Sequence, residues 1–157
     1  MVIEKKINTA AVRMTPLDPL DHALELLHFG FRGLTVEADA YLATLGLSRV
    51  HHRILYVIAR AEQLSVGELA ATLGVSKQAA HRPLSHLFER ELVCYSREPG
   101  RHRFKLLALT EQGQAVERNA TELERKLLRE AFAQTDENGQ QAWQAVMLSL
   151  AGQLNRP

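Results

Sequence analysis

Between Ser65 and Leu109 the spacing of apolar residues changes from a helical period to that of a strand, and few folds accommodate such a change in so short a segment. Two short stretches with helical spacing come first and meet at Gly74, a residue typical of a turn between helices. Residues 92–96 and 103–109 then read as the two strands of a hairpin. Two short helices followed at once by a hairpin predict a winged helix-turn-helix lobe.

Serine residues mark the starts of both helices in this lobe. Ser65 and Glu68 have the spacing of a capping box, in which the two side chains satisfy backbone donors at the start of the helix. Ser76 can accept a hydrogen bond in the first turn of the second helix. The inward face of that second helix is predicted to carry Ala80, Leu84, Leu87 and Phe88. Its outward face is predicted to carry Lys77, Gln78, His81 and Arg82.

Two helices are predicted before the lobe's helix pair. Apolar residues at spacings of three and four predict a helix from Asp18 to Leu45, with Pro19 in its first turn and Gly46 at its end. Ser48 can cap the next helix. The predicted buried face of that helix is Val50, Ile54, Leu55 and Ile58.

Two further helices are predicted after the hairpin. Thr110 can cap a long helix over residues 112–132, and Asp136 can cap a last helix. The apolar stripe of the last helix is Trp143, Val146, Leu150 and Leu154.

The predicted fold class is therefore mainly α with a small β-hairpin wing. A chain of 157 residues has the size of one domain, so residues 1–157 are treated as a single domain. The winged helix-turn-helix lobe covers residues 48–110, and the flanking helices cover residues 18–46 and 111–154.

Positive charge is concentrated in the lobe. The net charge is only +1, but residues 76–105 carry seven Lys or Arg and three Asp or Glu, whereas the segments on either side are slightly negative. His81, His86 and His102 lie in the same basic segment. A basic segment between acidic helices is typical of a surface that binds phosphates, and the alternative is a solvated charged face.

The order of helix and hairpin indicates which residues of the lobe would contact DNA. A helix in the major groove presents its first two turns to base edges, while a hairpin beside it reaches the backbone or the minor groove. The candidate contacts are Ser76, Lys77, Gln78, His81 and Arg82 on the helix and Arg97, Arg101, His102 and Arg103 on the hairpin.

Four stretches in this order, residues 65–70, 73–78, 87–93 and, with Arg103, 109–113, together closely resemble the MarR family of bacterial transcriptional regulators. The resemblance extends over the chain from Asp18 onward. It implies a homodimer in which the first and the last two helices interlock, with two winged-helix lobes on a pseudo-palindromic site in double-stranded DNA. It also implies a small-molecule effector that releases the DNA, and it favours a repressor over an activator.

The chain departs from the family pattern at three positions. Arg101 stands where the family commonly has an Asp that braces the wing, two residues before the Arg matched by Arg103. Pro83 lies inside the second helix of the pair, where it removes a hydrogen bond to the Ala79 carbonyl and is expected to kink or slightly unwind the helix. Glu91 stands where a Gly commonly ends that helix, so a less regular end is expected.

The resemblance also implies a place for the effector, where the first two helices meet the DNA-binding lobe. The residues of this chain at that junction combine aromatic rings with cations, which suits a small aromatic or acidic molecule. The alternative is that they pack in the dimer or form structural ion pairs. They are His28, Phe31, Arg32, His52, Arg53 and Tyr56.

The apolar stripes of the outer helices are longer than a winged-helix core of this size can cover. Left exposed, they would exceed the few hundred Å² of apolar patch that a monomer tolerates, so a homodimer is predicted. The alternative is that the stripes pack on each other within one chain. The residues concerned are Leu24, Leu27, Phe31, Trp143, Val146, Leu150 and Leu154.

The sequence contains none of the common catalytic motifs, such as G-x-S-x-G, a phosphate-binding glycine loop or H-E-x-x-H, so no enzyme activity and no cofactor are expected. Neighbouring His51 and His52 would point about 100° apart on a helix and could not hold one ion together, so no metal site is expected. Cys94, the single cysteine, is expected to be a half-buried packing residue rather than a sensor.

No apolar run approaches the roughly 18 residues of a membrane-spanning helix, and the first residues lack the apolar stretch of a signal peptide. A cytoplasmic protein without membrane contact is therefore expected. The alternative function is a dimeric helical module that binds a ligand or a protein and has lost DNA binding, with Pro83 and Arg101 as its signs.

Overall fold

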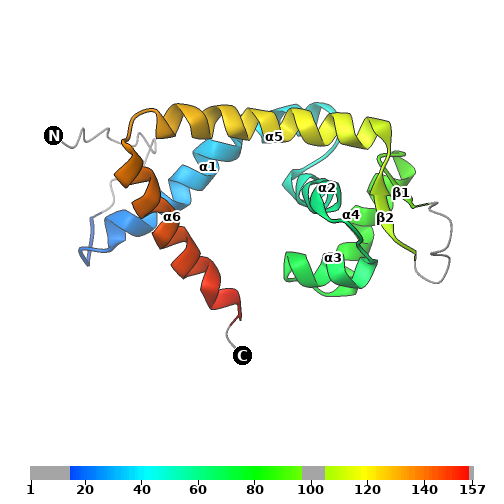
Figure 1. Ribbon diagram of the computed structural model, residues 1–157, viewed down its shortest axis with the longest axis horizontal. Coiled ribbons are helices and arrows are strands. Elements are labelled where there is room, and N and C mark those ends of the chain that lie inside the picture. Colours follow the sequence, from blue (N-terminus) through cyan, green and yellow to red (C-terminus); the bar gives the residue numbers. More distant parts are fainter. Residues whose placement is uncertain (1–14, 97–104, 156–157) are drawn as a thin grey trace. The chain divides into compact units, whose positions relative to one another are not determined.

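The structure, a computed structural model, describes residues 15–96 and 105–155 (Figure 1). The chain divides into two compact units, residues 1–36 and 37–157, and helix α1 (Asp21–Thr44) runs through the division. The described part of the first unit is the segment before α1 and the beginning of that helix. The second unit holds the end of α1 and all later elements.

The order of elements in the second unit is three helices, a hairpin and two more helices. In chain order they are α2 (Arg49–Arg60), α3 (Val66–Leu73), α4 (Lys77–Glu89), β1 (Val93–Tyr95), β2 (Leu107–Leu109), α5 (Glu111–Phe132) and α6 (Glu137–Ala151), followed by the 3-10 helix η1 (Gly152–Asn155). This order confirms the predicted fold class, mainly α with a small β-hairpin. No helix among the described residues is long and apolar enough to cross a membrane.

Four helices begin at the caps that the sequence predicted. In each, the side-chain oxygen of the cap accepts a hydrogen bond of 2.8–3.3 Å from the backbone N–H three residues later. This contact satisfies one of the donors that a helix start leaves free. The caps are Ser65, Ser76, Thr110 and Asp136.

Helix α1 begins three residues later than predicted. Asp21 Oδ2 accepts hydrogen bonds from the backbone N–H groups of Leu17 at 2.6 Å and Asp18 at 3.0 Å, and Asp18 Oδ1 accepts one from Leu20 at 2.8 Å. These bonds hold the segment as a turn, because the two carboxylates take backbone donors just ahead of the helix. Pro19 therefore lies in that turn and not in the first helical turn.

Helix α2 begins after its predicted cap, Ser48, but the capping contact and one face residue differ from the prediction. The backbone N–H of Ser48 donates to Nδ1 of His51 at 3.0 Å, so a histidine takes the place that Glu holds in an ordinary capping box. Val50 was predicted to be buried and is 55% exposed. Ile54, Leu55 and Ile58 are buried, and Val50 falls at the edge of their arc because successive helical residues lie about 100° apart.

The hairpin is short in its described part. Strands β1 and β2 are antiparallel, with Val93 opposite Leu109 and Tyr95 opposite Leu107. The backbone N–H of Leu107 also donates to the Leu64 carbonyl at 2.8 Å, which ties the hairpin to the segment before α3. Both strands are shorter than predicted, and the turn predicted at residues 98–102 lies outside the described residues.

One hydrophobic core holds the second unit together. Helix α2 lies at its centre, in contact with α3, α4, α5 and β2. The largest fully buried side chains are Leu42, Ile54, Leu55, Leu69 and Leu87.

Two backbone positions fix the joint between α4, β1 and α5. Glu91 has a φ of +55°, in the left-handed region, and the N–H of Leu92 donates to the Leu87 carbonyl at 3.0 Å. This is the regular pattern of a helix that ends in a left-handed residue, so the predicted irregular end is wrong and the strain falls on Glu91 alone. A Cβ on Gly113 would lie 1.9 Å from the Leu92 carbonyl oxygen, so only glycine allows α5 to approach the residue before β1 this closely.

Candidate DNA-binding surface

The first two turns of α4 expose polar and cationic side chains. Lys77, Gln78, His81 and Arg82 are all exposed, as the sequence predicted, and so is the cap Ser76. The other face of the helix is anchored in the core through Ala80, Leu84 and Leu87. The exposed donors and acceptors therefore stand on a helix whose position is fixed by packing.

Helix α3 and its connection set the position of α4. Gly74 has a φ of +67°, so the chain reverses direction after α3 through a residue that tolerates the left-handed region. The N–H of Val75 donates to the Ala70 carbonyl at 3.0 Å, and Ser76 then caps α4. This is a helix-turn-helix with a tight connection.

Pro83 does not interrupt α4. The helix continues from Lys77 to Glu89, with Leu84 and Leu87 buried directly after the proline. Packing of this face on the core holds the second half of the helix in place although Pro83 donates no hydrogen bond to the Ala79 carbonyl.

The wing is described only at its root. The backbone N–H of Ser96 donates to the Leu106 carbonyl at 2.7 Å, which continues the pairing of β1 and β2 by one step. The Lys105 ammonium lies 5.3 Å from the centre of the Tyr95 ring, a cation–π contact that the sequence analysis did not single out. The predicted wing contacts Arg97, Arg101, His102 and Arg103 lie outside the described residues.

His86 belongs to the basic segment by sequence but turns toward α2. Its ring lies 5.0 Å from that of His51, centre to centre, and its Nε2 is buried without a hydrogen-bond partner among the residues that the structure describes. Burial and the neighbouring His86 both lower the pKa of His51.

Among the described residues, no group of three or more His, Cys, Asp or Glu side chains is placed to hold a metal ion.

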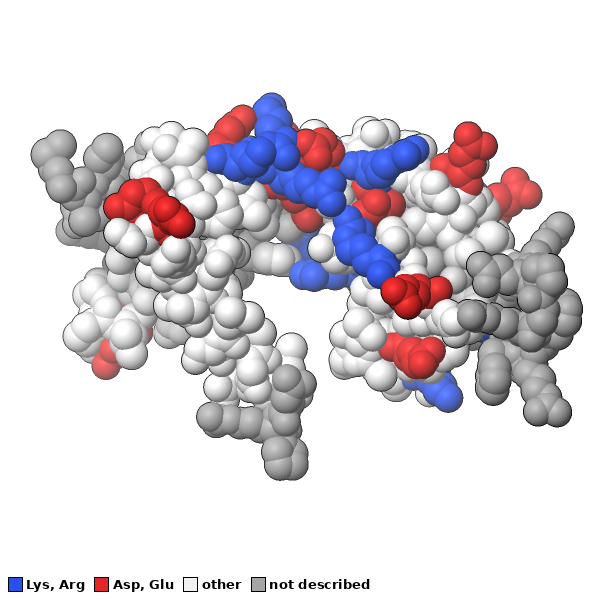
Figure 2. Space-filling view, viewed as in Figure 1, with Lys and Arg blue, Asp and Glu red and all other residues white. Residues whose placement is uncertain are grey.

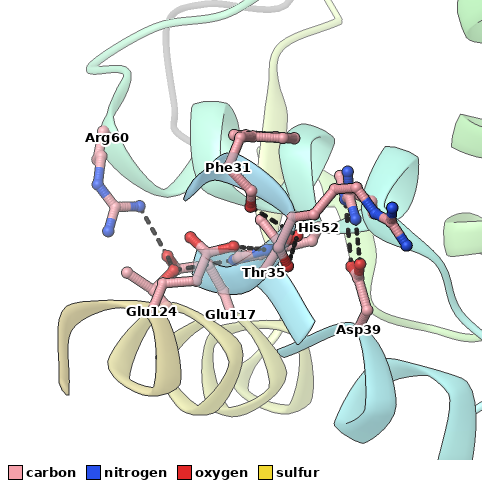
Figure 3. Close-up of polar contacts among 10 residues, drawn as sticks. Phe31, Thr35, Asp39, His52, Arg60, Glu117 and Glu124 are labelled. Carbon is pink, nitrogen blue, oxygen red and sulfur yellow. Dashed lines mark hydrogen bonds and ion pairs between the residues drawn. The ribbon is translucent and has the colours of Figure 1, made fainter. Parts of the chain in front are cut away.

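A polar network joins α2 to α5 (Figure 3). Thr121 donates its hydroxyl hydrogen to Glu117 Oε1 at 2.6 Å and lies 3.0 Å from His52 Nε2, so His52 donates through Nε2. Arg60 Nη1 donates to the same Glu117 oxygen at 2.7 Å. Nδ1 of His52 lies 3.6 Å from Oε1 of Glu124.

Burial governs the ionisation of this network. Burial lowers the pKa of His52, against an opposing effect of Glu117, and burial raises the pKa of Glu124. His52 is only 4% exposed, with its two nitrogens turned to Thr121 and Glu124. It therefore has a structural role between α2 and α5 that its residue type alone did not reveal.

The residues predicted to hold an effector are divided between the two units. His28, Phe31 and Arg32 lie on α1 in the first unit, and Arg53 and Tyr56 are exposed on α2 in the second, beside buried His52. Tyr56 lies under the Arg60 guanidinium, with 3.5 Å from the guanidinium carbon to the ring centre. The effector site stays a prediction.

Helix α6 exposes its apolar stripe. Within this chain none of its residues is buried, and Trp143 and Leu150 are 43% and 49% exposed. Val146 and, in η1, Leu154 are exposed as well.

Cys94 is half-buried in β1, where the sequence predicted a half-buried packing residue.

The fold and the exposed face of α4 define a class, the winged helix-turn-helix proteins. A family model described as the MarR family matches residues 45–103. The HTH-type transcriptional regulator PetP of Rhodobacter capsulatus is 35% identical over 117 residues, which cover 73% of this chain and 69% of PetP. This chain belongs to the MarR family, and it is a transcriptional regulator by that membership.

Solved structures agree with this assignment. The transcriptional regulator PA3341 superposes with a TM-score of 0.69 at 27% identity, over 85% of this chain and 99% of that one. A mutant of MepR from S. aureus, bound to an oligodeoxyribonucleotide, superposes with a TM-score of 0.56 at 16% identity, over 85% and 98% of the two chains. The second likeness supports the fold alone.

Proposed function

We propose that this chain is a homodimeric repressor that binds a specific, pseudo-palindromic site in double-stranded DNA through α4 and the wing. The observation that carries the proposal is the first half of α4, where Lys77, Gln78, His81 and Arg82 are exposed on a helix anchored by its opposite face. Amide and cationic side chains at this place suit base edges and phosphates. The MepR mutant of the same fold is bound to an oligodeoxyribonucleotide, so a protein with this fold can hold DNA.

The proposed division of the chain follows from this role. The lobe of residues 48–110 binds DNA, and the helices of residues 18–46 and 111–154 form the dimer. Two lobes related by a dyad would read half-sites about 10 base pairs apart on one face of the duplex. The exposed apolar stripe of α6 supports this arrangement, since a second copy would cover it.

A mobility-shift titration with the DNA upstream of the protein's own gene tests the proposal. Gln78→Ala is expected to relax preference at one base pair, at a cost of about 1–3 kcal/mol. Arg101→Ala and Arg103→Ala are expected to weaken binding to all sequences and to reduce the salt slope by about one unit for each lost phosphate contact. Lys126→Ala, which removes an exposed cation from α5, is the matched control.

Two results would count against this assignment. If Gln78→Ala and the arginine variants lost affinity equally for all sequences, the base-reading role of α4 would be wrong. If the wild-type dimer bound no DNA, the alternative would describe the protein better: a dimeric helical module that binds a ligand or a protein. Pro83 and Arg101 would then be the first residues to replace, with Arg101→Asp restoring the residue that is common in the family.

Release by an effector is the remaining part of the proposal. A ligand that weakens DNA binding 10- to 100-fold must favour the released form by about 1.4–2.8 kcal/mol, and DNA must weaken ligand binding by the same factor. Titration of aromatic carboxylates with and without operator DNA measures this coupling. Loss of release in Arg32→Ala or Arg53→Ala, with DNA affinity intact, would support the predicted site, and equal ligand affinity in both titrations would exclude coupling.

A further inference from the structure

A cavity of about 500 Å³ opens in the second unit at the root of the wing. Its walls come from the end of α2 and the turn after it, from Ser96 and residues 106–109 of the hairpin, and from the first turns of α5. This volume is within the range of sites that hold small molecules. None of the lining residues belongs to α4, so the cavity is distinct from the face of α4 that is proposed to contact bases.

The lining combines an apolar floor with a polar rim. Ile58 and Leu107 are buried and belong to the hydrophobic core, so the floor is rigid. The rim carries two carboxylates, two amides and one guanidinium. These are Glu62, Glu117, Gln63, Gln114 and Arg118.

Glu117 is the residue that gives this cavity a chemical preference. Its side chain is only 6% exposed, and both of its hydrogen bonds, from Arg60 and Thr121, end on Oε1. Oε2 accepts no hydrogen bond from any residue that the structure describes. Oε2 is not among the buried polar atoms that lack a partner, so it is open to solvent, and a donor placed in the cavity can take the place of water on it.

Arg118 in the lining and Arg60, which pairs with Glu117, balance the charges of Glu62 and Glu117, so the preference for a cation over an anion comes from the open Oε2 of Glu117 and not from net charge. Glu62 and Glu117 face one lining cation, Arg118, which is exposed and able to turn toward water. Arg60 holds Oε1 of Glu117 from outside the lining set, so the free oxygen is left to a ligand. An anion in the cavity would instead lie against a buried carboxylate.

We propose that this cavity binds a small organic cation whose N–H-rich head, an amidinium or a primary ammonium, donates to Glu117 Oε2 while its apolar body packs on the floor formed by Ile58 and Leu107. The charge of this ligand is opposite to that of the organic acid expected at the effector site. Its binding is measured without DNA, so the result is independent of the proposed function.

Calorimetric titration of the full chain with benzamidine tests the site, and benzoate and benzamide serve as the anionic and neutral probes of the same shape. Benzamidine is expected to bind saturably and at least ten-fold more tightly than either. Glu117→Gln is expected to weaken benzamidine at least ten-fold. Glu130→Gln, which removes an exposed carboxylate from the same helix, is expected to leave binding unchanged.

A second variant keeps the test decisive if Glu117→Gln does not fold. Ala59 is exposed and lines the cavity, so Ala59→Phe fills the cavity without disturbing the core. It is expected to abolish benzamidine binding, whereas Ala71→Phe, on exposed α3 surface outside the cavity, is expected to bind as the wild type does. Benzoate or benzamide binding as tightly as benzamidine, or unchanged benzamidine binding by Ala59→Phe, would overturn the proposal.

Discussion

The winged-helix lobe and helix α6 use their apolar residues in opposite ways. In the lobe, Ile54, Leu55 and Leu87 are fully buried by other parts of the same chain. In α6, no residue is buried, and Trp143 and Leu150 stay about half exposed. The two regions have similarly regular helices, so helix formation does not distinguish them.

This difference shows which part of the fold is complete within one chain. The lobe has a closed core, and its exposed face on α4 is polar and cationic, which suits nucleic acid. Helix α6 has no Lys or Arg, and Figure 2 shows none over it on the visible face. An uncharged, apolar helical face suits another protein surface, and the proposed second copy would provide it.

The largest expected effect is where α5 packs against the lobe, at Gly113. A methyl group there would meet the Leu92 carbonyl oxygen at 1.9 Å, so Gly113→Ala must push α5 away from β1. We expect a loss of about 3 kcal/mol or more in the free energy of unfolding, measured by urea denaturation. Gly152→Ala, after α6, meets nothing within 4 Å and is expected to be neutral. Equal effects of the two variants would remove the contrast between the regions.

The next effect concerns assembly, through Leu150 on the apolar stripe of α6. Leu150→Glu is expected to weaken the dimer by about 2 kcal/mol or more, since an apolar anchor in an interface is replaced by a charge. Leu148, which is 72% exposed on the opposite side of the helix, provides the control Leu148→Glu, with no expected effect. Sedimentation at micromolar concentration measures both. A monomeric wild type, or equal effects of the two variants, would contradict the proposed interface.

Acid is expected to weaken the lobe through His52. Because burial lowers its pKa in the folded chain, the unfolded chain binds more protons below the ordinary histidine pKa of about 6.5. The stability contributed by neutral His52 is therefore present above pH 6.5 and is lost as the pH falls below it. The free energy of unfolding is expected to drop between pH 7.5 and 5.5 in the wild type and to drop less in His52→Gln. An identical drop in both proteins would assign the effect to other groups, such as His51.

The smallest expected effect is a gain in stability at Glu91. Its φ of +55° is strained for a residue with a Cβ, so Glu91→Gly is expected to stabilise the lobe by up to about 1 kcal/mol. Thermal unfolding measures the gain, and Glu89→Gly, at the last residue of α4 and without a positive φ to relieve, is the control and is expected to bring no gain. A loss of stability in Glu91→Gly would show that the side chain contributes more than the strain costs.

Local features of the chain were predictable because they depend on neighbours in sequence. The caps at Ser65, Ser76, Thr110 and Asp136, the turn at Gly74 and the exposed set on α4 are all set within one or two helical turns. The change from helical to strand spacing gave their order, and with it the fold class.

The order of elements and the outward face of α4 are thus properties of the sequence by itself. Tertiary structure alone decided that Val50 is exposed, that His86 turns toward His51, and that His52 and Glu117 are buried between α2 and α5. A helical period tells which residues share a face, but a face at the edge of the core is buried only where another helix covers it. Coverage depends on contacts between residues far apart in the chain, such as the close approach of Gly113 to Leu92.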